Sequence, residues 1–161
     1  GTILVPGLLL LLKTGFVFGW AKPVPVTWSN LRHPRRDMVL VAAAGPAANL
    51  LMAFLWGALA KVATLMPETA RWAAEPLLYM GGLGVLFNVL LMVFNLLPLP
   101  PLDGGRVVVS LLPHRQAYQL SRIEPYGMFI LIFLAITPVL GWILMPLVSL
   151  MYQLLSLLFG I

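Results

Sequence analysis

The chain has 161 residues, of which 61% are hydrophobic and 9% are charged, and its mean hydropathy is +0.98. Soluble domains are about a quarter charged, so this composition excludes a soluble globular domain and predicts a chain whose solvent is lipid. The formal net charge is +5 and cysteine is absent, which excludes disulfides and thiolate metal sites.

Four apolar stretches predict an all-α polytopic membrane protein with about four transmembrane segments, and we treat residues 1–161 as one membrane-embedded domain. A crossing helix needs about 20 residues, which each of the first three stretches supplies once. The fourth is too long for one straight crossing and has candidate breaks at Thr137-Pro138, Gly141 and Met145-Pro146. It predicts either one helix with a re-entrant piece or two short helices. The stretches are 1–19, Met38–Ala60, Leu77–Leu102 and Tyr126–Ile161.

The basic residues lie between these stretches, and their distribution predicts the orientation. Residues 20–37 and 103–125 are rich in arginine, whereas the charges of residues 61–76 balance. Because cytoplasmic loops carry an excess of Lys and Arg, we expect 20–37 and 103–125 to face the cytoplasm and 61–76 the opposite side. The same rule explains the positive net charge without a nucleic-acid partner.

Residues 19–28 contain Pro23 and Pro25 and should form a short extended or hairpin-like segment rather than a helix. Two prolines at a spacing of two remove hydrogen-bond donors from one edge of such a segment and leave the other edge able to pair. One interpretation is a stiff connector with interfacial tryptophans. The other is an edge, at Val24 and Val26, that receives an extended peptide.

Two asparagines lie inside the apolar stretches, in the segments Gly45-Pro46-Ala-Ala-Asn49 and Gly81–Asn88. Small residues let membrane helices approach closely, so packing explains both segments. The functional alternative is that Asn49 orients a polar site. The two histidines, His33 and His114, lie in separate basic loops, where we expect contacts with solvent or lipid headgroups rather than zinc ligation.

Residues 95–105 place one carboxylate, Asp103, at the end of an uncharged apolar stretch. Three prolines break the helix there, and broken backbone at membrane depth requires protein or a water cavity around it. A charge beside hydrocarbon costs about 3 kcal/mol and needs a partner or a cation. Asp103 can cap a helix that restarts at 107–112, pair with Arg106, or bind a metal ion. The local pattern leaves all three possibilities open.

Three segments resemble the site-2 protease family of intramembrane zinc metalloproteases, in its short form without a PDZ domain. Asn95-x-x-Pro98-x-Pro100-x-Leu102-Asp103-Gly104 matches the second signature of that family. Gly45-Pro46-Ala-Ala-Asn49 is similar to its Gly-Pro-x-x-Asn segment, and residues 19–26 are similar to its hairpin-like segment. The resemblance covers roughly residues 1–112. It implies a Zn²⁺-dependent endopeptidase that cleaves transmembrane or membrane-associated peptide substrates, with Asp103 as the third zinc ligand.

The resemblance also implies roles for other residues and a location in the cell. Asn95 would lie at the active site, where it polarises the scissile carbonyl or binds the developing oxyanion. The edge at Val24 and Val26 would hold an unwound substrate. We expect an integral protein of a prokaryotic cytoplasmic membrane, with the active site towards the cytoplasmic side.

The sequence departs from the family in one respect, because the His-Glu-x-x-His signature does not occur in it. That signature supplies two zinc ligands and the general base. In short members its helix precedes a segment resembling Gly1–Leu4, so we expect an N-terminally truncated fragment. These residues alone should bind zinc weakly and cleave nothing, because one carboxylate is not a zinc site. The alternative is a non-catalytic membrane protein, transporter-like or scaffold-like, that uses Asp103 for cation or proton binding.

Overall fold

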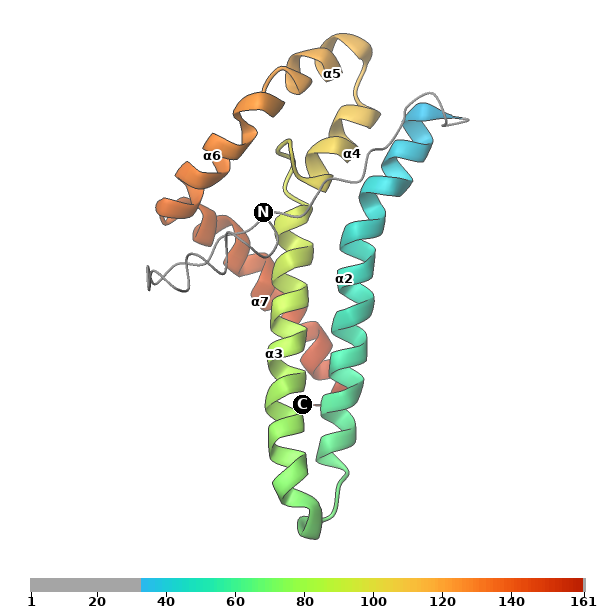
Figure 1. The fold of residues 1–161 in the computed structure, drawn as a ribbon, viewed down its shortest axis with the longest axis vertical. Coiled ribbons are helices and arrows are strands. Elements are labelled where there is room, and N and C mark those ends of the chain that lie inside the picture. The colour runs from blue at the N-terminus through green and yellow to red at the C-terminus, as the bar shows by residue number, and fades with distance from the viewer. Residues whose placement is uncertain (1–32, 161) are drawn as a thin grey trace, which may run out of the picture. The chain divides into compact units, whose positions relative to one another are not determined.

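The computed structural model describes residues 33–160, which form helices joined by short turns without a β-strand (Figure 1). Three helical segments are long and apolar enough to cross a membrane, and α5 with α6 forms a pair bent by 58° that would count as a fourth. The expected all-α membrane fold is therefore confirmed for this range, while the stretch 1–19 and the segment 19–28 lie outside it. The elements are α2 Pro34–Thr64, η2 Glu68–Ala70, α3 Arg71–Asn95, α4 Asp103–Leu111, α5 His114–Ser121, α6 Glu124–Ile136 and α7 Val139–Phe159.

Helices α2 and α3 pack against each other as an antiparallel hairpin whose turn contains η2 (Figure 1). Small residues set their spacing: a side chain at Gly81 would strike Ala60, and one at Gly84 would strike the indole of Trp56. Such close approach gives membrane helices van der Waals contact, which matters because lipid provides no hydrophobic driving force for their association. The packing interpretation of these glycines is confirmed, and Asn88 donates its amide to the Gly84 carbonyl within the same helix at 2.8 Å.

Helix α7 packs on α3 and completes the core. At its end, the ring of Phe159 meets the ring of Phe54 edge-on, with centroids 6.0 Å apart. Gly160 follows in the left-handed conformation that favours glycine at helix ends, and Lys61 Nζ lies next to it. Helix α7 therefore ends beside the C-terminal part of α2. The buried core residues are Ala53, Val85, Val89, Met92, Val93, Leu144, Val148 and Leu155.

The fourth apolar stretch breaks once, at Thr137-Pro138, between α6 and α7. The two other candidate breaks, Gly141 and Pro146, were wrong because both lie inside α7. A proline is tolerated in a membrane helix when neighbouring groups satisfy the freed backbone. Pro146 frees the carbonyl of Trp142, whereas the Ser149 hydroxyl donates a hydrogen bond to the carbonyl of Pro146 itself at 3.0 Å.

The contacts at the two ends of this stretch show how it passes along the hairpin. Helix α6 begins against the proline-rich turn after α3, since a side chain at Gly127 would strike Pro100. Helix α7 ends at the opposite end of the hairpin, beside Lys61. The 13 residues of α6 extend about 20 Å, less than the roughly 30 Å of a hydrocarbon core. Residues 124–160 therefore make one net passage, with α7 as the crossing helix.

The chain breaks between α3 and α4, so the proline-broken helix expected near residues 95–103 is confirmed. Helix α4 starts at Asp103, earlier than the expected residue 107, and runs through the glycines at 104 and 105. These glycines are buried, and a side chain at either would strike the backbone of residues 96–100. Close packing of the turn against α4 thus outweighs the low helix propensity of glycine.

Candidate functional site

Asp103 is the first residue of α4, a helix that packs on α2. Its half-buried carboxylate lies against Gly45 of α2, because a Cβ built on Gly45 would stand 2.5 Å from Asp103 Oδ2. Real Cβ atoms do not approach an oxygen this closely. A larger residue at this point of α2 would therefore displace the carboxylate, and this contact is not evident from the local sequence, which indicates only helix packing for Gly45.

The structure shows neither the helix cap nor the Arg106 pair that the local sequence allows for Asp103. The N-cap of α4 is Leu102, and no side chain hydrogen-bonds at that cap. Arg106 is exposed, and the ion pairs among residues 33–160 belong to Arg71. Within this range the Asp103 carboxylate forms no hydrogen bond or ion pair. A half-buried carboxylate among apolar helices without such a partner is a candidate cation ligand.

The face of α2 that meets Asp103 also carries Asn49, which follows Gly45 by four residues and so lies one turn further along. Asn49 is half-buried. The contact with Asp103 lies about two turns beyond Met38, where the charge-free part of α2 begins, which corresponds to about 10 Å along the helix. Asp103 thus contacts the charge-free part of α2 rather than its charged start.

Asn95 is the last residue of α3 and is half-buried. The turn that follows it folds onto α4, because a side chain at Gly104 would strike the carbonyls of residues 96 and 97. The structure therefore brings the end of α3, the start of α4 and the Gly45–Asn49 face of α2 together at one end of the hairpin. Val24 and Val26 lie outside the described residues.

The described residues do not form a complete metal site by themselves. Between residues 33 and 160 no group of three or more His, Cys, Asp or Glu side chains could hold a metal ion. His33 and His114 are exposed at the starts of α2 and α5. The backbone N–H of His33 donates a hydrogen bond to the Asp37 carboxylate at 2.9 Å. Asp103 fits the role of one oxygen ligand, since its carboxylate has no ion pair or hydrogen bond among residues 33–160 and lies in a cradle that a Cβ would fill.

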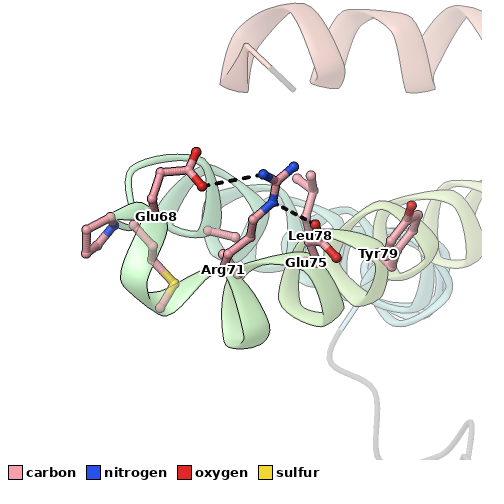
Figure 2. Close-up of a pocket in the computed structure, with 9 residues that line it drawn as sticks. Glu68, Arg71, Glu75, Leu78 and Tyr79 are labelled. Atoms are coloured by element: carbon pink, nitrogen blue, oxygen red, sulfur yellow. Dashed lines mark hydrogen bonds and ion pairs between the residues drawn. The ribbon is translucent and has the colours of Figure 1, made fainter.

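A pocket of about 400 Å³ lies at the other end of the hairpin, around η2. Figure 2 shows Arg71 between two carboxylates there, with its Nε 2.9 Å from Glu75 and one terminal nitrogen 3.4 Å from Glu68. Ala63, which lines this pocket, is about five turns or 27 Å along α2 from Gly45. The pocket is therefore separate from the Asp103 site.

Comparisons with known proteins identify a matching family and two similar chains. The model of Peptidase family M50 matches residues 57–138, a range that includes Asn95 and Asp103. "Putative zinc metalloprotease YwhC" of Bacillus subtilis (strain 168) is 35% identical over 144 residues, which are 89% of this chain and 65% of that protein. "Putative zinc metalloprotease Rip2" of Mycolicibacterium smegmatis is 35% identical over 109 residues, 66% of this chain and 39% of that protein. The chain spans less than two thirds of either relative. No solved structure matches it.

Proposed function

The chain belongs to peptidase family M50, the site-2 protease family, and from this premise we propose that it takes part in zinc-dependent hydrolysis of transmembrane or membrane-associated peptides. The observation that supports this most directly is the Asp103 carboxylate. It is held against Gly45, in the charge-free part of α2, without an ion pair or hydrogen bond among residues 33–160. The names of the two relatives, both described as zinc metalloproteases, support the same chemistry.

Each candidate residue has a distinct role in this proposal. Asp103 supplies one oxygen ligand, as in catalytic sites built from two histidines and a carboxylate. A bound Zn²⁺ supplies Lewis acidity that activates water and polarises the scissile carbonyl. Asn95 donates its amide hydrogen to the carbonyl oxygen as negative charge develops. Asn49 orients polar groups on the α2 face, while Val24 and Val26 hold the unwound substrate in an extended form.

The proposal is tested with the protein expressed from its full gene and reconstituted in vesicles with a transmembrane substrate. Cleavage should stop when 1,10-phenanthroline removes zinc and should return when Zn²⁺ is added, as followed by gel electrophoresis of the substrate. Cleavage that continues in the chelator would contradict a zinc enzyme. Cation flux across the vesicles without cleavage would instead favour the transporter-like alternative.

Gly45→Ala should lower zinc affinity and turnover by about 10- to 100-fold, the range found when the surroundings of a metal ligand are disturbed. The reason is the Cβ, which would take the space that Asp103 Oδ2 occupies. Zinc affinity is measured by competition with a coloured chelator. Gly82→Ala is the matched control, since a Cβ there meets only the Tyr152 hydroxyl at 3.8 Å. Equal affinities in both variants would show that Gly45 does not position Asp103.

We further propose that the site faces the cytoplasmic side of a bacterial cytoplasmic membrane. Helices α4 and α5, with their arginines, lie at the end of the hairpin where α2 begins, and the η2 turn lies at the opposite end (Figure 1). The excess of arginine favours the cytoplasm for the first end. Cysteines at Gln116 and Thr69 should therefore react with an impermeant thiol reagent from opposite faces of sealed vesicles. Labelling of both from one face would refute this topology.

A further inference from the structure

Helix α5 carries a cationic, aromatic stripe on its exposed side. Arg115, Tyr118, Gln119 and Arg122 follow a spacing of three, four and seven residues, which places them on one face. All four are exposed, and Tyr118 is 68% exposed. The half-buried residues of the helix, Ala117, Leu120 and Ser121, lie on the other face. The helix is therefore turned so that its inner face contacts protein and its outer face offers two guanidinium groups around a tyrosine.

The arginines at this end of the hairpin form no ion pair among residues 33–160. The arginine at the other end, Arg71, is held by two glutamates. Residues 1–32 contain no Asp or Glu that could serve as a partner. Of the acids at this end of the hairpin, Asp37 accepts the hydrogen bond from the His33 backbone, Asp103 is half-buried, and Glu124 is exposed two residues after Arg122. The end therefore presents an excess of positive charge. Its exposed arginines are Arg35, Arg36, Arg106, Arg115 and Arg122.

We propose that the exposed stripe of α5 binds the phosphate groups of anionic phospholipids, and that α5 lies in the membrane interface. Guanidinium groups bind phosphate oxygens in a bidentate manner, and tyrosine favours the headgroup level of a bilayer. A short amphipathic helix with a basic face is the form that such interfacial binding takes. This inference does not depend on proteolytic activity.

Lipid suits this surface better than an acidic segment of a partner protein, because exposed apolar side chains flank α5 on both sides. Leu111, just before it, is 70% exposed, and Ile123 and Tyr126, just after it, are 38% and 66% exposed. The apolar helix α6 continues from α5 at a bend of 58°. The helix thus joins a basic surface to a segment with the composition of a membrane helix, and a lipid interface offers anionic groups and hydrocarbon together.

The test uses the protein from its full gene in vesicles, with a bimane fluorophore on Gln116→Cys, beside the stripe. Cysteines elsewhere in the gene product are replaced by serine. Quenching is compared between brominated phosphatidylglycerol, which is anionic, and brominated phosphatidylcholine, which is zwitterionic. Phosphatidylglycerol should quench several-fold more effectively. The double variant Arg115→Gln/Arg122→Gln should abolish this preference, because one basic residue near an anionic surface already accounts for a fold-change of about five.

Two control variants make the result specific to the stripe. Arg115→Lys/Arg122→Lys keeps the charge and should keep most of the preference, which also shows that the helix tolerates substitution. Arg71→Gln removes a charge at the other end, where Glu68 and Glu75 already neutralise it, and should leave the preference unchanged. The proposal would be overturned if the two lipids quenched equally in the protein that keeps Arg115 and Arg122. It would also be overturned if the double glutamine variant kept the preference for phosphatidylglycerol.

Discussion

Asp103→Ala should abolish cleavage of a transmembrane substrate and strip zinc from the protein expressed from its full gene, while membrane insertion is retained. The carboxylate is the one acidic side chain that the described residues place against the charge-free part of α2, and a methyl group cannot replace it. Cleavage is followed on the substrate and zinc is measured by atomic spectroscopy, at equal expression of both proteins. Asp103→Asn should behave in the same way, because the neutral amide is a poor ligand of similar size.

Two further variants separate a ligand from a structural carboxylate. Asp103→Glu keeps the charge but adds a methylene where Oδ2 already lies against Gly45, so it should not restore activity. Arg106→Gln removes the charge nearest along α4, but Arg106 is exposed and forms no ion pair among residues 33–160. It should therefore leave cleavage unchanged. Full activity in Asp103→Ala, or an equal loss in Arg106→Gln, would eliminate the ligand assignment.

Asn95→Ala should reduce turnover by about 10²- to 10³-fold, the cost of removing one donor to a developing oxyanion, with zinc retained. Asn95 ends α3 at the turn that packs on α4, so its amide is placed near the site without being a metal ligand. The measurement is kcat together with zinc content. Asn88→Ala is the matched control, because the Asn88 amide is already bonded to the Gly84 carbonyl in its own helix. A loss of zinc in Asn95→Ala would contradict the donor role.

Local sequence was sufficient to predict the features that depend on proline and on apolar length. The break after Asn95 was predicted because three prolines in four residues cannot continue a helix. Thr137-Pro138 was among three candidate breaks in residues 126–161, but local sequence did not show which of the three interrupts the helix. Which of them interrupts the helix depends on how each segment packs and which neighbour satisfies the freed backbone groups.

The contact between Gly45 and Asp103 lies beyond local prediction, because it joins residues on two helices far apart in the sequence. The sequence pointed to Asp103 through the cost of a charge beside hydrocarbon. It gave Gly45 only a general packing role, since small residues occur along many membrane helices. Gly45 differs from other small residues because it faces Asp103 across the contact between α2 and α4, and this contact exists only in the folded protein.

The depth of Asp103 along α2 has a consequence for the products of the proposed reaction. A straight substrate helix cut about 10 Å from the edge of the hydrocarbon core leaves roughly seven apolar residues on one piece. The remainder, more than ten residues, stays with the other piece. Since about 20 residues are needed to span a bilayer, seven cannot hold a fragment in the membrane. The shorter piece would therefore dissociate into water on the side of α4 and α5, and the longer one would remain dissolved in lipid. Release would be directional without any separate sorting step.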